Sequence, residues 1–337
     1  RLMVGDAIYT RFTPLTFSKP QYNGLRLDLA NSQHSATLLL SRPSDPNGPY
    51  QNDVGLINSG NGTHATHLVA GHADLALGAW ARLGLSYVNV HTAHTQNELN
   101  NGNPLNGTLT LRQNQPLRTF WVRLRDDSPQ DLQGGATLLA HDIVLTDTSG
   151  QRLRGSEIGF LPQVEGGISE GGALVADGNE QILLKYDLNA LDHEELTAGA
   201  LRSVQVALDV ADDYRIETAS NLQTDGVSGS SNPVFLTQAR AAGNVQDRSN
   251  TGLRTLSYGL PVASEIYGFN WNMPDWHGLS AQGEMAVNRR LQRYPNPSLK
   301  RHHQTAKTAA ATYGQFAYRR YPLSLIHISE PTRPFHI

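Results

Sequence analysis

The sequence predicts an all-β protein, and three observations support this. Apolar residues alternate with polar or small residues over many segments, which is the period-two pattern of strands. Clusters of Gly, Asn, Asp, Ser and Pro separate these segments as turns do. The segments also come in two lengths, long near both ends of the chain and short in the middle. We therefore expect two kinds of sheet.

The clearest long strands lie in Thr66–His94, where two strands of about ten residues meet at Gly78-Ala79. Globular strands usually run about 5–6 residues, whereas a strand that crosses a bilayer needs roughly 9–11. Trp80 and Tyr87 lie near the strand ends, where membrane strands carry aromatic girdles. One face of this predicted hairpin is apolar or small, and it consists of Val69, Gly71, Ala73, Leu75, Leu77, Ala81, Leu83, Leu85 and Tyr87.

Further long strands are predicted at Tyr22–Ala30, His34–Arg42, Gly252–Trp271, Trp276–Arg290 and Ala306–Tyr321, with a tight turn at Asn272–Asp275. The segment Trp276–Arg290 alternates best. If it crosses a membrane, one set of its side chains faces lipid: Leu279, Ala281, Met285 and Val287. The opposite set then faces a lumen: Gln282, Glu284 and Asn288.

The middle of the chain has a different sequence pattern from its two ends. From Thr108 to Glu217, short strands and Gly-rich turns follow one another, as in a β-sandwich domain. Roughly 110 residues is an ordinary size for one domain. Its expected core consists of Phe120, Val122, Leu124, Ile143, Leu145, Ile182, Leu184, Val204, Val206 and Leu208.

The connections between the long strands alternate in length. Short ones are expected at 31–33, 78–79 and 272–275, and long ones at 43–65, 95–251 and 291–304. Bacterial outer-membrane barrels join their strands by short periplasmic turns and longer outer loops. The chain therefore resembles outer-membrane β-barrel proteins that carry an inserted surface β-sandwich domain. The resemblance is one of class, and it rests on strand length and connection length.

That resemblance implies a partial antiparallel membrane β-barrel with an inserted β-sandwich or jelly-roll-like domain. We expect barrel strands in 1–94 and 251–322 and the inserted domain in 95–250, with its core at about 108–218. About seven long strands do not close a barrel, since bacterial barrels have eight or more, so the chain is expected to be a fragment. The tail Leu323–Ile337 resembles a translated sequencing adapter, and we exclude it from the fold prediction.

The function implied is non-enzymatic: surface binding or passage of a solute. The expected location is the bacterial outer membrane, with the inserted domain extracellular. The expected partners are the lipid bilayer and lipopolysaccharide, with a glycan or protein ligand at the surface. The alternative is a secreted multi-domain β-sandwich protein that binds or degrades carbohydrate. In that alternative the apolar strand faces would be buried in protein rather than exposed to lipid.

Composition narrows these choices. A formal charge of −3 gives no support for nucleic-acid binding, and the absence of Cys excludes disulfides. The sequence contains no run of 18 apolar residues, so no transmembrane helix is predicted. No nucleophile elbow, phosphate loop or metalloprotease motif is present, so no catalytic residue is predicted.

Three groups of polar residues remain as candidate sites. Carboxylates at predicted turns are oxygen ligands suited to a structural Ca²⁺, although their spacing fits no known calcium loop: Asp126, Asp127, Asp131, Asp212 and Asp213. A basic run offers contacts to anionic headgroups: Arg289, Arg290, Arg293 and Arg301. Histidines gather between His64 and His94, which most simply makes them loop and lumen residues. Apart from the weak Ca²⁺ candidates, no cofactor is expected.

Overall fold

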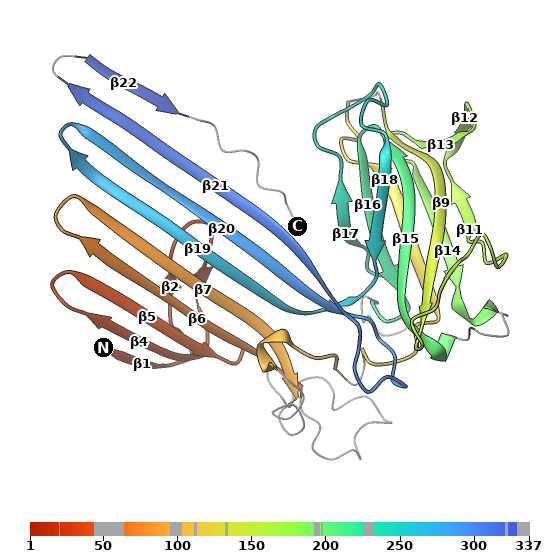
Figure 1. Cartoon of the computed structure of the whole chain (residues 1–337), viewed down its shortest axis with the longest axis horizontal. Helices are drawn as coiled ribbons and strands as arrows, with labels where there is room; N and C mark the ends of the chain where they lie inside the picture. The colour runs from red at the N-terminus through yellow and green to blue at the C-terminus, as the bar shows by residue number, and fades with distance from the viewer. Residues whose placement is uncertain are drawn as a thin grey trace. The chain divides into compact units, whose positions relative to one another are not determined.

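A computed structural model of the chain describes residues 1–19, 21–43, 64–94, 103–110, 113–131, 134–191, 196, 198–224, 232–320 and 323–328. The chain divides into two compact units. Unit 1 comprises Arg1–Thr110, Pro261–Gln292 and Ala306–His336. Unit 2 comprises Leu111–Leu260 and Arg293–Thr305. Their strands are coloured red to orange and blue in unit 1, and yellow-green to cyan in unit 2 (Figure 1).

Unit 1 is built on one antiparallel sheet of nine strands, ordered β1-β4-β5-β6-β7-β19-β20-β21-β22. Within the described part of the chain this sheet has two open edges and is not closed into a barrel. Its strands are β1 (Leu2–Gly5), β4 (Gly24–Ala30), β5 (His34–Ser41), β6 (His64–Leu77), β7 (Ala81–His94), β19 (Leu260–Trp276), β20 (Leu279–Arg293), β21 (Gln304–Arg320) and β22 (Leu323–Ile328). The predicted long antiparallel strands are therefore confirmed.

The hairpin between β19 and β20 turns later than predicted. The sequence predicts the turn at Asn272–Asp275, but β19 continues to Trp276 and the turn residues are His277 and Gly278. Both have positive φ, 54° and 86°, which a two-residue type I′ turn requires. Asp275 Oδ1 also accepts the Gly278 N–H at 2.8 Å. The prediction was wrong because it followed the Asn-Met-Pro-Asp composition rather than the residue able to adopt positive φ.

Unit 2 contains two further antiparallel sheets that share a core. One has the path β12-β13-β9-β15-β18 with β10 beside β9, and the other has the order β11-β14-β8-β16-β17. Every predicted core residue is buried, from Phe120 to Leu208. The strands are β8 (Thr119–Asp126), β9 (Ala136–Asp147), β10 (Arg152–Arg154), β11 (Gln163–Gly166), β12 (Ile168–Glu170), β13 (Ala173–Ala176), β14 (Gln181–Asp187), β15 (Leu201–Ala211), β16 (Tyr214–Ser220), β17 (Leu236–Arg240) and β18 (Gly252–Ser257).

Two segments differ from the prediction in their partners. Residues Gly252–Ser257 are predicted to begin a long strand that runs to Trp271, but this segment is β18 and pairs with β15 in unit 2. Tyr294 and Asn296, which lie in the long connection expected at 291–304, are both buried. The Asn296 side chain donates to the carbonyl of Leu201 at 2.7 Å. Only long-range contacts decide such assignments, since alternation alone does not name a strand's neighbour.

The tail is paired at its start. Strand β22 lies antiparallel to β21, with Leu325 opposite Tyr318. The side chains of β22 and the whole of 329–337 lie outside the described residues. The resemblance of Leu323–Ile337 to an adapter therefore stays a prediction. Most of the long connection expected at 43–65 and the first part of the one expected at 95–251, residues 95–102, also lie outside the described residues.

Candidate functional site

The cross-strand registers of the nine-stranded sheet define two faces. One row joins Leu38, Gly71, Tyr87 and Tyr267 across β5, β6, β7 and β19, and we call its side the apolar face. The adjacent row joins Thr37, His72, Ser86 and Gly268, and we call its side the polar face. The predicted alternation of Thr66–His94 is thus confirmed, and it continues into the neighbouring strands.

The apolar face exposes large hydrophobic side chains on each strand from β1 to β21, the strands of the sheet whose side chains the structure describes. Their exposed fractions run from 38% at Leu77 to 74% at Val4. The members are Leu2, Val4, Leu29, Leu38, Leu40, Leu75, Leu77, Leu85, Tyr267, Met285, Phe316 and Tyr318. Single exposed hydrophobic residues are ordinary on a protein surface, but a contiguous face of them marks a surface that contacts a protein or a lipid.

An aromatic side chain also fits over small residues on this face. Trp271 on β19 lies in the row of Leu83, and its ring covers Gly283 on β20. A Cβ at position 283 would come within 2.1 Å of that ring, so the close approach requires glycine. Because Gly283 faces Trp271, the other odd-numbered residues of β20 also belong to the apolar face.

This result fixes the two predicted sets of side chains on β20. Met285 is 47% exposed on the apolar face, Leu279 and Val287 are half-buried, and Ala281 is buried. On the polar face Gln282 is exposed, and Asn288 accepts a hydrogen bond from Ser264 at 3.1 Å. Glu284 is 1% exposed. The two sets therefore lie on opposite faces, as the alternation predicts, whereas the contact of either face with lipid or a lumen stays a prediction.

A buried polar cluster limits the apolar face at one end of the strands. The rings of Tyr87 and Tyr267 are 5.2 Å apart. Beyond them, Asn89 Nδ2 donates to Glu265 Oε1 at 3.4 Å. Asn89 Oδ1 lies 2.7 Å from Nδ1 of His91, at hydrogen-bond distance. Arg289 lies 3.7 Å from the Glu265 carboxylate. The short 3-10 helix η2 (Pro104–Asn106) covers the cluster, since the Leu105 carbonyl also accepts from Asn89.

Hairpin turns limit the other end. Trp80 follows the turn at Gly78, and Trp276 precedes the turn at His277; both indoles are about half exposed. On β6 the apolar stretch runs from Val69 to Leu77, about 26 Å at roughly 3.3 Å per residue. A lipid-facing band is about 25 Å tall with aromatic residues at its borders. In a barrel with strands tilted by about 35–45°, this stretch would project to about 19–22 Å, somewhat less than the height of such a band.

The predicted basic run does not form one loop. Arg289, Arg290 and Arg293 belong to β20, and only Arg301 lies in the connection to β21. Arg289 pairs with Glu265, and Arg301 is exposed. Because successive strand side chains alternate, Arg289 and Arg290 point to opposite faces. The sequence prediction missed this because it ended the strand at Arg290.

The five aspartates considered for Ca²⁺ are mostly occupied by protein donors. Asp127 pairs with Arg215 at 2.5 Å and with Arg240 at 3.2 Å. Both oxygens of Asp126 accept backbone N–H groups, and both oxygens of Asp212 accept hydrogen bonds. Asp131 accepts a hydrogen bond from the side chain of Asn244. Over the described residues, no three His, Asp or Glu side chains are arranged to hold a metal ion.

Two oxygens in this group, Asp131 Oδ1 and Asp213 Oδ2, have no hydrogen-bond partner among the described residues, and of the two residues only Asp213 is fully buried. Asp213 is 3% exposed. Burial raises the pKa of its carboxyl above the ordinary value. The Ser128 hydrogen bond opposes this rise in the pKa, and the Asp127, Asp126 and Asp131 carboxylates add to it.

Asp213 should therefore destabilise unit 2 at neutral pH. A carboxyl whose pKa is raised by folding binds its proton more tightly in the native state, so stability falls as pH rises above about 4 and through the folded pKa. We expect Asp213→Asn to increase the free energy of unfolding at pH 7 by about 1 kcal/mol and to flatten this pH dependence. Urea unfolding between pH 3 and 8 measures both; an unchanged profile would contradict the assignment.

The histidines of the first hairpin separate onto the two faces. His67 and His91 stack on the apolar side, with ring centroids 5.5 Å apart. His72 lies on the polar face, where Nε2 is 3.2 Å from Asp74. The side chains of His64 and His94 lie outside the described residues.

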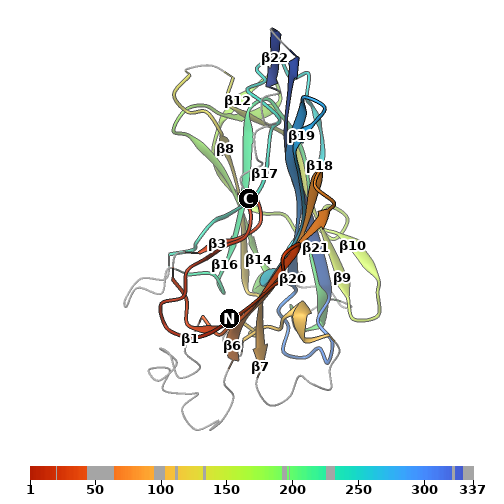
Figure 2. The same cartoon turned by 90° about the vertical axis from the view of Figure 1, so that its left-hand side faces the viewer.

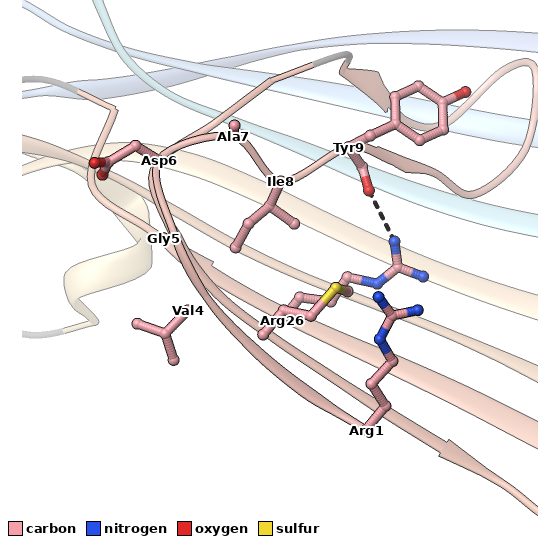
Figure 3. A pocket seen from close by; sticks show the side chains of 9 residues that line it. Arg1, Val4, Gly5, Asp6, Ala7, Ile8, Tyr9 and Arg26 are labelled. Carbon is pink, nitrogen blue, oxygen red and sulfur yellow. Dashed lines mark hydrogen bonds between the residues drawn. The ribbon is translucent and has the colours of Figure 1, made fainter.

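A hollow of about 560 Å³ lies at the β1 edge of the sheet (Figure 3). Met3, Ile8, Tyr9 and Arg26 line it with Arg1. The Arg26 guanidinium donates to the Tyr9 carbonyl at 2.8 Å and pairs with Asp28. Its charge is therefore already satisfied by the protein, and the hollow shows no catalytic group.

No helix in the described ranges has the length and hydropathy to cross a membrane. Comparison of the sequence with known protein-family models finds no match, and comparison with curated proteins finds none either.

Proposed function

We propose that the nine-stranded sheet is part of a bacterial outer-membrane β-barrel whose apolar face contacts lipid. The observation that carries this proposal is the apolar face itself. Its large side chains, such as Leu38, Leu85 and Met285, are about half exposed rather than packed against protein. An exposed hydrophobic face is unfavourable in water, whereas hydrocarbon solvates it well.

Strand length and face borders support the same proposal. Strands β6 and β7 have 14 residues, β20 has 15, and β19 and β21 have 17 each. These exceed the roughly 9–11 residues that a tilted membrane strand needs. The extra residues extend past Tyr267 to Glu265 and Arg289, which suits an interfacial border where the sheet leaves hydrocarbon.

The connections suggest an orientation. Two-residue or similarly short turns join β4 to β5, β6 to β7 and β19 to β20. The connection from β7 to β19 carries unit 2 from the opposite end of the strands. In the proposed barrel the short turns are periplasmic, and unit 2 is an extracellular β-sandwich. The role is then non-enzymatic, either binding at the cell surface or passage of a solute.

Accessibility of single cysteines tests the proposal, because the chain has none of its own. Leu38→Cys, Leu85→Cys and Met285→Cys probe the apolar face, and Gln282→Cys, exposed on the polar face, is the matched control. With the full chain in lipid vesicles, a label at the first three should be quenched by a lipid-confined quencher. The first three should also react slowly with a water-soluble maleimide, and Gln282→Cys should react fast.

Two outcomes would contradict the proposal. If Leu85→Cys reacts with the water-soluble maleimide as fast as Gln282→Cys, the apolar face lies in water. If it is reached by neither reagent, another protein layer covers the face. The second outcome would favour the secreted protein that binds or degrades carbohydrate.

A further inference from the structure

The segment between β1 and β4 crosses the polar face instead of forming a short turn. These strands are neighbours in the sheet, yet Asp6–Asn23 lies between them and contains the small hairpin of β2 (Thr10–Arg11) and β3 (Ser18–Lys19). Figure 2 shows this red segment on one side of the sheet, which is seen nearly edge-on. We call Asp6–Asn23 the crossing loop.

Apolar contacts hold the base of the crossing loop. Ile8 and Tyr22 form a buried cluster with four residues of the polar face, and Phe12 and Phe17 pack against it. The four sheet residues are Leu39, Leu68, Ala70 and Val88. The ring of Phe12 also stacks on His72 of β6, with centroids 5.3 Å apart. The loop thus covers a group of apolar side chains on the polar face.

The tip of the loop reaches strands on the far side of β7. Thr16 lies over Gly268 on β19, where a Cβ would come within 2.2 Å of its methyl group. On β20, Glu284 Oε1 accepts a hydrogen bond from the Thr13 hydroxyl and the N–H of Leu15 at 3.0 Å. The hydroxyls of Thr13 and Thr16 also bond to each other. One carboxylate therefore fixes a loop that starts at the opposite edge of the sheet.

The charge of Glu284 explains its importance. Its side chain is 1% exposed, and a buried carboxylate is stable only where donors replace water. Both donors to Oε1 belong to the loop, and Oε2 has no hydrogen-bond partner among the described residues, so detaching the tip would leave the carboxylate without those two bonds. The loop and Glu284 consequently stabilise each other.

We propose that the crossing loop is an inward-folded plug that Glu284 fastens to the polar face, so that it keeps solutes out of this part of the barrel lumen. The inference rests on the proposed function, since the polar face is a lumen wall only in a barrel. It favours surface binding over passage of a solute through the section lined by β5 to β20.

Maleimide labelling of the full chain in lipid vesicles tests the plug. Ser86→Cys reports on the covered region, because Ser86 is 7% exposed and lies beside Gly268 under Thr16. Gln282→Cys reports on an uncovered position of the same face. We expect Ser86→Cys to react with a water-soluble maleimide at least about tenfold more slowly than Gln282→Cys.

Removing the Glu284 carboxylate, which holds the tip of the crossing loop, should expose Ser86→Cys to the maleimide. Glu284→Ala should raise the labelling rate of Ser86→Cys by about tenfold. Glu265→Ala is the matched control, because Glu265 is equally buried but lies on the apolar face away from the loop, and it should leave the rate unchanged. Equal rates at Ser86 and Gln282 in the parent, or no effect of Glu284→Ala, would overturn the proposal.

A cross-link keeps the proposal testable if Glu284→Ala does not fold. Thr16→Cys with Ser86→Cys should form a disulfide on mild oxidation, and Thr16→Cys with Gln315→Cys, farther along the sheet, should not. Failure of the first pair to cross-link would overturn the placement of the loop. Lipid quenching at Leu85→Cys reports the membrane proposal separately. If Ser86→Cys is protected from maleimide but Leu85→Cys lies in water, the polar face is not the wall of a barrel lumen. The contact between the crossing loop and the sheet would still stand.

Discussion

Replacing Leu85 by Arg should lower the free energy of unfolding of the membrane-inserted protein by about 2–4 kcal/mol. Leu85 shares a row with Ala73, in the middle of the apolar stretch of β6, and with Phe269. A cation there would have to enter hydrocarbon without a partner, since the nearest carboxylate at that end, Glu265, already pairs with Arg289. Denaturant unfolding in lipid vesicles measures the change.

If Leu85 lies in water, the same substitution should change the free energy of unfolding very little. The measurement therefore distinguishes contact with lipid from contact with water. Leu85 is 52% exposed, and exposed surface substitutions usually change stability by no more than about 0.5 kcal/mol. Gln282→Arg is the control, because Gln282 is exposed on the polar face and tolerates charge in either setting. A loss below about 0.5 kcal/mol for Leu85→Arg in vesicles would be incompatible with lipid contact.

The two segments of unit 2, 111–260 and 293–305, joined by a short linker and expressed as one chain, should unfold cooperatively, whereas the segment Thr108–Glu217 should not. The sequence predicts that the shorter segment is a domain, but this segment ends within β16 and omits β17 and β18. It also omits Tyr258, whose ring packs on Phe120 at 4.9 Å and whose hydroxyl donates to Ser220 at 2.6 Å.

The size of this effect follows from the core. Removing one large buried aromatic side chain costs about 3–5 kcal/mol, and a domain is stable by only about 5–15. Losing β18 also leaves the β15 edge, including Val206 and Leu208, without its partner strand. Urea unfolding followed by circular dichroism checks both chains. A cooperative transition in Thr108–Glu217 would show that β17 and β18 are dispensable.

The sequence determined what depends on neighbouring residues. Successive strand side chains point to opposite faces, so alternation alone separated Met285 from Glu284 and sorted the core of unit 2. The short connection at Gly78 was equally local, because glycine there adopts a φ of 60°. The length of the alternating segments likewise distinguished two kinds of sheet, because the span of a strand is a local property of the chain.

The tertiary structure decided which distant segments meet. Nothing near Thr13 in the sequence points to Glu284, since that hydrogen bond joins residues 271 positions apart. The alternating pattern of Gly252–Ser257 fits either unit, and only its register with β15 assigns it to unit 2. The physical reason is that period two fixes the direction of each side chain along a strand, whereas the partner of a strand depends on packing across the whole chain.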